Sequence, residues 1–385
     1  MLYHLEDIEK IREVEKEVSN NGYKVFDISH WDSGKDYNKL LLSSLEIQPY
    51  YEPFKYIYNY EISPQIHSLV ENKLLQEANT EICSILIPSS TLSIVNIANF
   101  LQKHKLNKIC LLQPSYFTVE PCLNAFGLHV ETRSLELSGN KFIIPLEDIL
   151  SNNYDVIWIT SPVFCTGTYF DETEITKLQL ILDNQRFIIC DESLSILGYS
   201  LRKKLSNSKF LITIHSPHKV ISTNSIKFSC ILCNNDYKDF FDQWIDLFCG
   251  GLPLSSYIAA NHFISENYDN CLKMHLDYTD SIKQSDSIKQ SIVTLLNKYD
   301  GQISFSHNIG QYMSIFYPMV PFKESIRFNF IKRLITCTHV SLLPGYLEGF
   351  YQELGFCFRV NLTLDKTLLI TSINKVLQYL KNNYP

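Results

Sequence analysis

The sequence lacks the features of a membrane protein or a nucleic-acid-binding protein. No apolar run approaches the about 18 residues that a membrane helix needs, and the charged segment Met1–Lys10 lacks the basic and then apolar regions of a signal peptide. A formal net charge of -7, from 34 basic and 41 acidic side chains, gives no broad cationic surface for binding phosphates. We therefore expect a cytoplasmic protein that binds neither a membrane nor nucleic acid.

The cysteines lack the pattern of a disulfide framework or a zinc site. They number 11, an odd count, and most stand alone in apolar segments, as Cys110 and Cys190 do. Cys230 and Cys233 form one CxxC, but this spacing on a strand points the two side chains to opposite faces, and no second pair lies nearby. We expect buried free thiols in a reducing compartment and no bound metal.

The middle third of the chain predicts an α/β fold. At 385 residues and 45% hydrophobic, the chain can bury one large core and a second smaller one. Short apolar runs alternate with amphipathic helical patterns, as in β-α units wound into a mostly parallel sheet. The predicted strands are Glu81–Ile87, Lys108–Gln113, His129–Ser134, Asp155–Thr160, Arg186–Cys190, Phe210–His215 and Phe228–Cys233. The predicted helices between them are Thr91–His104, Thr118–Phe126, Pro145–Leu150 and Glu172–Leu182.

The pattern changes outside this block. Leu2 to about Ser19 is typical of an acidic amphipathic helix, and Leu254–Leu296 of one long or broken helix between two domains. The C-terminal part contains the apolar run Leu334–Leu342, a Pro344-Gly345 turn, a predicted strand Phe356–Leu362 and a final helix Asp365–Lys381. We predict a large domain over residues 56–270 and a smaller α+β domain over 271–385, which residues 1–55 join.

Short polar motifs follow several predicted strands, at the positions where open α/β sheets bind ligands. In chain order the motif residues are Tyr60, Ser89-Ser90-Thr91, Pro114-Ser115-Tyr116, Ser161-Pro162-Val163-Phe164-Cys165-Thr166-Gly167, Asp191-Glu192, Ser216-Pro217-His218-Lys219, Lys227 and Arg359. This order resembles the fold type I aminotransferases that depend on pyridoxal 5'-phosphate (PLP), the aspartate-aminotransferase-like class I and II enzymes. The resemblance covers most of the chain from about Tyr60. It implies a seven-stranded, mostly parallel sheet, an amino acid or 2-oxo acid substrate, and a homodimer with shared active sites.

Lys219, Asp191 and Tyr116 are the candidate catalytic residues. A lysine becomes a nucleophile toward an aldehyde when burial and nearby positive charge lower its pKa, whereas an ordinary loop lysine stays solvated. The resemblance implies that Lys219 forms the imine to PLP. It also implies that Asp191, at the end of a buried run, bonds the protonated pyridine nitrogen. Considered alone, Asp191 would also suit the N-cap of a helix.

The segment Ser89-Ser90-Thr91 is the candidate phosphate site. It lies between a predicted strand and a predicted helix, where backbone N–H groups and the positive helix end suit a phosphate dianion. Serine and threonine at this place can also act only as a helix cap. The resemblance implies that Ser216 and Lys227 complete the site. Lys227 stands where the family usually has arginine, so it should hold the phosphate less rigidly.

Three further residues acquire roles from the resemblance. Tyr116 matches the aromatic residue that stacks on the pyridine ring, although the adjacent Phe117 could do the same. Tyr60 matches a tyrosine that reaches the phosphate of the neighbouring subunit, and it could equally be a core aromatic. Arg359 lies in an apolar strand, where a buried guanidinium requires a carboxylate partner. The resemblance makes that partner the α-carboxylate of the substrate; the alternative is a salt bridge to a local Asp or Glu.

Two positions depart from the family pattern. Phe164 replaces an asparagine and Leu194 replaces a tyrosine, both of which donate to the phenolic oxygen of the cofactor in the family. Without these donors the phenolate keeps more charge and the internal imine becomes more basic. Ser161, Ser193 or Tyr199 could substitute as donors.

His218, directly before Lys219, is unusual for this branch. It could bond the phosphate, transfer a proton or simply pack as a buried imidazole. Our leading hypothesis is amino-group transfer, with Lys219 as covalent anchor and general base and acid. The altered donors leave a second hypothesis open, in which the same cofactor supports decarboxylation, elimination, cyclisation or oxidation. A third, a non-catalytic cofactor-binding module, is disfavoured because Lys219, Asp191 and Arg359 are all present.

Overall fold

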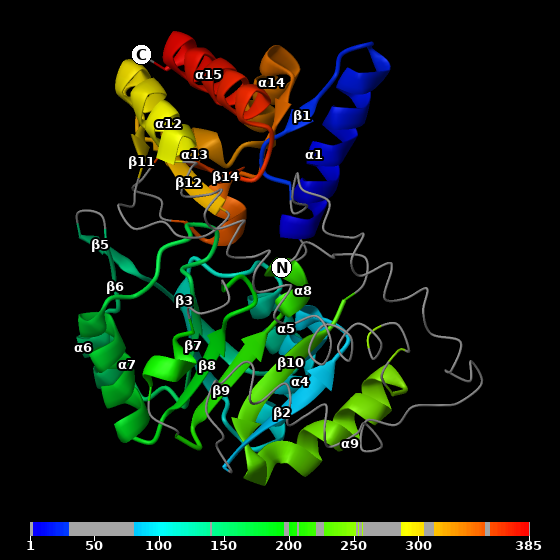
Figure 1. Cartoon of the computed structure of the whole chain (residues 1–385), viewed down its shortest axis with the longest axis vertical. Coiled ribbons are helices and arrows are strands. Elements are labelled where there is room, and N and C mark those ends of the chain that lie inside the picture. The colour runs from blue at the N-terminus through cyan, green and yellow to red at the C-terminus, as the bar shows by residue number, and fades with distance from the viewer. Residues whose placement is uncertain are drawn as a thin grey trace.

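The computed structural model describes residues 3–30, 81–138, 141–195, 200–205, 208–220, 227–251, 253, 256, 286–303, 312–350 and 355–384. These residues form a large unit around one broad sheet and a smaller unit that carries both the N-terminal helix and the C-terminal helix (Figure 1). The candidate site residues belong mainly to the large unit.

The large unit is built on a seven-stranded sheet with the order β2-β10-β9-β8-β7-β3-β4. Neighbouring strands pair in parallel except β10, which runs antiparallel to both β2 and β9. The predicted seven-stranded, mostly parallel sheet is therefore confirmed, and each strand lies within one residue of its predicted bounds. The strands are β2 (Ile82–Ile87), β3 (Lys108–Gln113), β4 (His129–Ser134), β7 (Val156–Thr160), β8 (Phe187–Asp191), β9 (Leu211–His215) and β10 (Ser229–Asn234).

Helices cover both faces of this sheet, which explains why its central strands are apolar without alternation. In β7, Trp158 belongs to the hydrophobic core on one face, whereas Ile157 and Ile159 belong to the core on the other. The first face is covered by α4 (Ser90–Lys103), α5 (Val119–Ala125) and α9 (Lys238–Cys249). The second is covered by α6 (Leu146–Ser151) and α7 (Glu172–Asp183).

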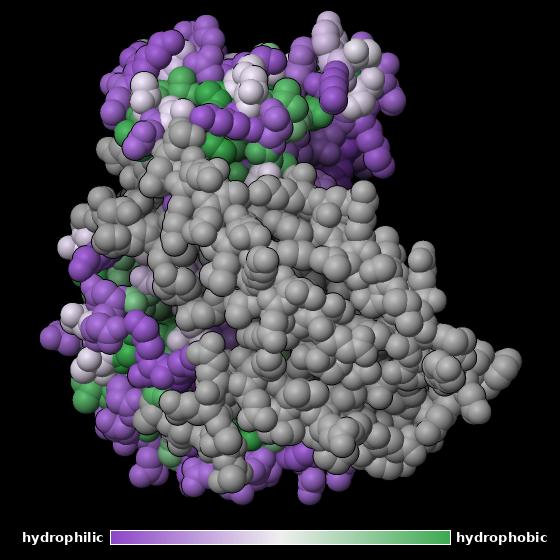
Figure 2. Space-filling view, in the orientation of Figure 1, coloured by the Kyte–Doolittle hydropathy of each residue, from purple (hydrophilic) through white to green (hydrophobic). Residues whose placement is uncertain are grey.

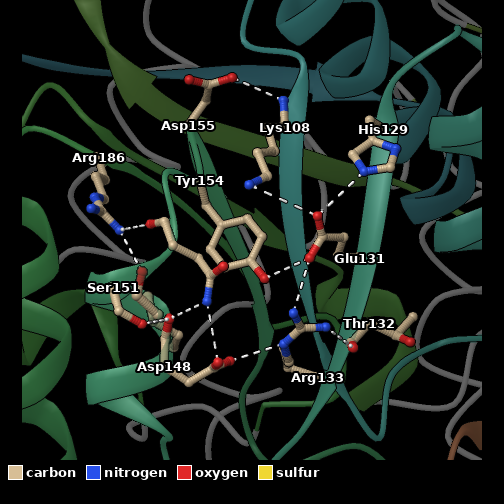
Figure 3. A network of polar contacts seen from close by, with 12 residues as sticks. Lys108, His129, Glu131, Thr132, Arg133, Asp148, Ser151, Tyr154, Asp155 and Arg186 are labelled. Carbon is tan, nitrogen blue, oxygen red and sulfur yellow. Dashed lines mark hydrogen bonds and ion pairs between the residues drawn. The ribbon is translucent and has the colours of Figure 1, made fainter.

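Charged side chains protect the edge of the sheet at β4. Glu131 accepts a hydrogen bond from the Tyr154 hydroxyl (2.9 Å) and from Arg133 (3.0 Å), and Arg133 also donates to Asp148 (2.9 Å). These residues form one connected network across β4, β3 and α6 (Figure 3). Such a charged edge disfavours pairing with a strand of another molecule.

The smaller unit joins residues from the two ends of the chain. The short strand β1 (Phe26–Asp27) pairs in parallel with β13 (Val340–Ser341), which places the N-terminal segment beside the C-terminal region (Figure 1). Ile11, Val14 and Val18 of the first helix are buried in the same core as residues of the last helix. The other elements are α1 (Tyr3–Asn20), α12 (Asp286–Tyr299), β11 (Gln302–Ile303), β12 (Tyr312–Tyr317), α13 (Phe322–Ser325), α14 (Phe328–Thr338), β14 (Phe356–Asn361) and α15 (Lys366–Asn383).

Some sequence predictions differ from the structure or fall outside it. The apolar run Leu334–Leu342 is divided between α14 and β13, because His339 adopts a left-handed conformation (φ 58°) that ends the helix. The predicted domain boundaries at residues 55/56 and 270/271, and most of the helix predicted over Leu254–Leu296, lie outside the described residues.

The burial of the cysteines also differs in part from the prediction. All described cysteines are free, as predicted, but Cys337 in α14 is exposed and Cys122 and Cys249 are only half-buried. On the face shown in Figure 2, hydrophilic residues cover much of the surface of the described residues. Within the described part of the chain, no helix combines the length and the apolar character that a membrane crossing requires.

The N-cap of α15 provides a test of this architecture. The Asp365 carboxylate accepts a hydrogen bond from the backbone N–H of Leu368 (2.9 Å), and α15 packs its apolar face into the core of the smaller unit. Asp365→Ala should lower the free energy of unfolding by about 1 kcal/mol, whereas Asp365→Asn, which also caps, should be close to neutral. Urea unfolding followed by circular dichroism measures both, and an equal effect of the two substitutions would contradict the capping role.

Candidate active site

The candidate residues gather at one edge of the large sheet. Because β2, β3, β7, β8 and β9 run in the same direction, their carboxyl ends share this edge, and the antiparallel β10 begins there. Lys219 lies in the short helix α8 (Pro217–Val220), on the side of the sheet toward the smaller unit (Figure 1). The motifs that follow these strands, or precede β10, are Ser89-Ser90-Thr91, Pro114-Ser115-Tyr116, Ser161, Asp191, Ser216-Pro217-His218-Lys219 and Lys227.

Lys219, Asp191 and Tyr116 lie close enough to interact. The Lys219 Nζ atom is 5.8 Å from the centroid of the Tyr116 ring. Burial lowers the pKa of Lys219, the positive charge of Lys227 lowers it further, and the attraction of Asp191 opposes both effects. A lysine with a lowered pKa is more often neutral, which is the state in which its amine can attack a carbonyl carbon.

Asp191 is held rigidly at the end of β8. Its side chain is only 4% exposed, and its Oδ1 atom accepts a hydrogen bond from the backbone N–H of Ser193 (2.9 Å). The backbone N–H of Ser161 donates to the Asp191 carbonyl (3.0 Å), which ties the end of β7 to the end of β8. The carboxylate is thus buried, is oriented by the Ser193 N–H and lies close enough to Lys219 for its charge to act on the amine.

Tyr116 connects the loop after β3 to the start of α4. Burial raises the pKa of Tyr116, and the hydroxyl groups of Thr91 and Thr118 oppose part of this rise, so the phenol stays neutral. The ring of Phe164 lies 5.9 Å from the Tyr116 ring, and that of Phe117 lies 4.6 Å away (centroid distances). Tyr116 and Phe117 are therefore neighbours, but it is Tyr116 whose ring lies over the Lys219 amine.

The start of α4 has the geometry of a capped helix. The Ser89 hydroxyl accepts a hydrogen bond from the backbone N–H of Leu92 (3.3 Å), so the cap proposed as an alternative from the sequence is present. Ser90 is buried and Thr91 is exposed. The helix continues for 14 residues, so its N-terminus carries the partial positive charge that favours an anion.

Ser216 directly follows β9 and Lys227 precedes β10, and these two strands pair with each other. The Ser216 hydroxyl is 2.8 Å from the Ser229 hydroxyl and donates to that of Ser193 (3.3 Å). Lys227 is exposed, and its charge acts on both Lys219 and His218. The structure thus places a positive side chain and a hydroxyl cluster at this edge.

His218 is a buried, neutral imidazole. It is 2% exposed, and its Nδ1 atom lies 2.6 Å from the carbonyl oxygen of Phe228. Burial, reinforced by the charge of Lys219, lowers the pKa of His218 to about 3. Since the carbonyl can only accept, Nδ1 carries the proton and donates it to this bond.

Arg359, in β14, is bound to three other segments. Its Nε and Nη2 atoms donate to the carbonyl oxygen of Ser29 (3.2 and 2.8 Å), and its Nη1 atom donates to Cys165 Sγ (3.2 Å). Nη1 also donates to Glu348 Oε1 (3.1 Å), and both side chains are almost fully buried. The carboxylate that meets Arg359 in the structure is therefore Glu348, which is the alternative that the sequence left open.

Glu348 was not singled out from the sequence. It ends the short 3₁₀ helix η5 (Gly345–Glu348), and its backbone carbonyl accepts a hydrogen bond from Ser115 (3.1 Å), next to Tyr116. The only signal was an acidic residue in the otherwise uncharged run Gly345–Phe350. Substrate binding by Arg359 remains a prediction.

These residues fit PLP. The pyridine nitrogen requires a carboxylate, the aldehyde an amine of lowered pKa, the ring an aromatic neighbour and the phosphate a positive helix end. Asp191, Lys219, Tyr116 and the start of α4 provide these features at one sheet edge. Phe164 and Leu194 carry no donor for the phenolic oxygen, and Tyr60 and Tyr199 lie outside the described residues.

Solved structures with this fold include several PLP enzymes. The chain resembles a kynurenine aminotransferase from Pyrococcus horikoshii (TM-score 0.78, 13% identity, covering 97% of this chain and 95% of that chain). It also resembles an aspartate aminotransferase from Thermotoga maritima (TM-score 0.76, 14% identity, 97% and 96%). A PLP-bound C-S lyase from Staphylococcus hominis is similar as well (TM-score 0.71, 15% identity, 92% and 88%). At these identities the likeness shows the fold alone.

Comparison of sequences gives the family. No curated protein matches the chain. The family model described as "Aminotransferase class I and II" matches residues 58–373, which is most of the chain and includes all the candidate residues from Tyr60 to Arg359. The chain belongs to the class I and II aminotransferase family and is a PLP-dependent aminotransferase-like enzyme.

Proposed function

We propose that this enzyme transfers an amino group between an amino acid and a 2-oxo acid, with Lys219 as the residue that attaches the cofactor and moves the proton. PLP, when bound, supplies an aldehyde for attachment and a ring that accepts electrons from the substrate α-carbon. The observation that carries the proposal is the desolvated amine of Lys219 beside Asp191 and Tyr116. With PLP bound, Lys219 would hold its aldehyde, and the Nζ amine, once free, would carry a proton from the substrate α-carbon to the cofactor.

Asp191 and Tyr116 orient the ring in this proposal. The buried carboxylate of Asp191 bonds the pyridine nitrogen and keeps it protonated, which strengthens the electron-accepting character of the ring. The Tyr116 ring stacks on the pyridine and fixes its tilt. Ser161 acts through its backbone by holding the end of β8 in place.

The phosphate is proposed to bind at the start of α4. The backbone N–H groups of Ser89, Ser90 and Thr91 and the helix dipole favour the dianion, and Lys227 adds a point charge. Ser216 belongs to the same edge, where its hydroxyl is already bonded to two serines, so we assign it the role of shaping the site through that cluster. His218 supports β10 through its bond to Phe228, and burial lowers its pKa to about 3, so it is neutral near neutral pH.

The substrate side chain is not specified by this geometry. The similar solved structures include aminotransferases named for kynurenine and for aspartate, whose side chains differ in size and charge. Arg359 is the proposed ligand of the substrate carboxylate. The family match favours amino-group transfer over the other reactions that Phe164 and Leu194 left open from the sequence.

Lys219→Ala should abolish covalent attachment of PLP and lower amino-group transfer by at least about 10²- to 10⁴-fold, because both the anchor and the proton carrier are lost. Borohydride reduction followed by peptide mass spectrometry should place the cofactor on Lys219 in the wild type and nowhere in the variant. Lys204→Arg, a surface lysine paired with Glu172, is the control and should keep the attachment. Cofactor attached to a different lysine would contradict the assignment.

His218 should stay neutral through the working pH range. Because its pKa is lowered to about 3, its imidazole signals in a nitrogen-correlated NMR spectrum should not move between about pH 5 and 9, with the proton on Nδ1. A titration with a midpoint near the ordinary value of about 6.5 would show that His218 exchanges protons with the site.

We also propose a cytoplasmic homodimer in which Tyr60 reaches the phosphate of the neighbouring subunit. Light scattering should then give twice the 44.7 kDa mass of one chain. Tyr60→Phe should weaken PLP binding without changing this mass, because only one hydroxyl is removed. A monomeric mass for the PLP-loaded enzyme would refute the shared-site arrangement.

A further inference from the structure

Arg359 is hydrogen-bonded mainly to uncharged groups. Its Nε and Nη2 atoms donate to the carbonyl oxygen of Ser29, and its Nη1 atom donates to Cys165 Sγ and to Glu348 Oε1. The Cys165 thiol stays neutral because burial raises its pKa well above the ordinary range. The centroid of the Tyr312 ring lies 5.0 Å from the guanidinium carbon, and an aromatic face stabilises a cation without neutralising it. Among these partners, only Glu348 has a side chain that could carry a compensating negative charge.

The surroundings of Glu348 do not suit a negative charge. The residue is 1% exposed, and its Oε2 atom is buried without a hydrogen-bond partner among the described residues. An ionised carboxylate spreads its charge over both oxygens, so an oxygen with neither a donor nor water makes that state costly. Arg359 meets Glu348 through a single contact to Oε1 and not through a bidentate pair. These contacts favour the neutral carboxylic acid.

The titratable groups around Glu348 act in the same direction. Burial raises the pKa of Glu348, and Arg359 and the Cys165 thiol oppose only part of this rise. Glu348 also acts on the thiol of Cys357 in β14, whose pKa burial raises well above its ordinary range, so this thiol is neutral. Among the described residues, Arg359 is thus the one cation whose charge acts on Glu348.

The turn that carries Glu348 is fixed to the large unit. The backbone N–H of Ser115, next to Tyr116, donates to the Glu348 carbonyl oxygen (3.1 Å). The following residue, Gly349, is left-handed (φ 80°), and a Cβ atom there would lie 2.8 Å from the side chain of Gln113, the last residue of β3. The turn therefore packs directly against the residues that lead from β3 to Tyr116. Glu348 connects this loop to the guanidinium on β14.

We propose that Glu348 is a positioning residue that acts as a neutral carboxylic acid, accepting a hydrogen bond from Arg359 and orienting the guanidinium without neutralising it. The substrate carboxylate then becomes the counter-ion of Arg359, so the buried pair carries no net charge. Because the sulfur of Cys165 is a weak acceptor, it is the partner that a carboxylate oxygen replaces at least cost. The bond to Ser115 holds Arg359 in a fixed relation to Tyr116. The inference rests on the proposed function in taking Arg359 as the carboxylate ligand.

A pair of substitutions separates the hydrogen bond of Glu348 from its charge. Glu348→Ala removes the acceptor and should raise KM for amino acids about tenfold or more while kcat at saturation changes less than about threefold. Glu348→Gln is neutral and keeps an acceptor, so it should restore KM to within about twofold of the wild type. For 2-phenylethylamine, compared with phenylalanine, Glu348→Ala should leave KM unchanged, because this amine has no carboxylate.

Two kinetic results would overturn the proposal. An unchanged KM for amino acids in folded Glu348→Ala would show that Glu348 does not position Arg359. A change of about tenfold or more in Glu348→Gln would show that an ionised Glu348 is required or competes with the substrate. Glu174→Gln is the matched control, because Glu174 is a buried carboxylate paired with Lys177 away from this site, and it should change neither constant.

Infrared spectroscopy tests the protonation state itself. The difference spectrum of the PLP-loaded wild type minus Glu348→Gln near neutral pH should contain the carbonyl band of a protonated carboxylic acid. The band should shift in deuterated water, because the acid exchanges its proton. Carboxylate bands in its place would refute the neutral acid.

A binding measurement separates this inference from the proposed reaction. Propionate is an unreactive carboxylate whose affinity for the PLP-loaded protein is measured by calorimetry without turnover. Glu348→Ala should bind it about tenfold or more weakly than the wild type, whereas Glu348→Gln and Glu174→Gln should bind it equally well. Arg359→Met, which removes the cation at similar length, should lose the binding. Retained binding in Arg359→Met would refute Arg359 as the carboxylate ligand; loss in Arg359→Met with no change in Glu348→Ala would refute only the role of Glu348.

Discussion

The shared direction of six strands of the large sheet is the constraint on which the rest of the structure depends. It brings residues that are far apart in the sequence to one edge of the sheet, where β8 presents Asp191 and the turn after β9 presents Lys219. Burial at this edge lowers the pKa of Lys219, while the nearby carboxylate limits that change. An amine and a carboxylate at the same edge of the sheet, both largely removed from water, suit a cofactor that needs one at each end of its ring.

Much of the large unit could be predicted from the sequence. Helices cover both faces of the sheet, so its central strands are continuous apolar runs, and the polar residues directly after them mark the ligand edge. The smaller unit was predicted less well, because its short strands and helix ends depend on contacts with the N-terminal segment. The break at His339 is an example, since a left-handed residue inside an apolar run leaves no pattern.

The position of a candidate residue could be predicted from the sequence where the residue follows a strand. It could not be predicted where the position depends on packing between distant segments. Lys219 and Asp191 belong to the first kind. The bonds of Arg359 belong to the second, because Ser29, Cys165 and Glu348 come from three distant segments that only the fold brings together. The sequence required a carboxylate partner for Arg359, but it could not choose between the substrate and a residue of the chain.

The described site is therefore defined by the residues of its cofactor edge, whereas the carboxyl group that meets Arg359 belongs to the chain itself. The central proposal for this site is that Asp191 and Lys219 flank one pyridine ring. An experimental structure of the PLP-loaded enzyme tests this most directly. The account predicts a bond from Lys219 Nζ to the cofactor, the Asp191 carboxylate within about 3 Å of the ring nitrogen and the Tyr116 ring stacked on the pyridine. A cofactor bound elsewhere, or with its ring nitrogen turned away from Asp191, would contradict it.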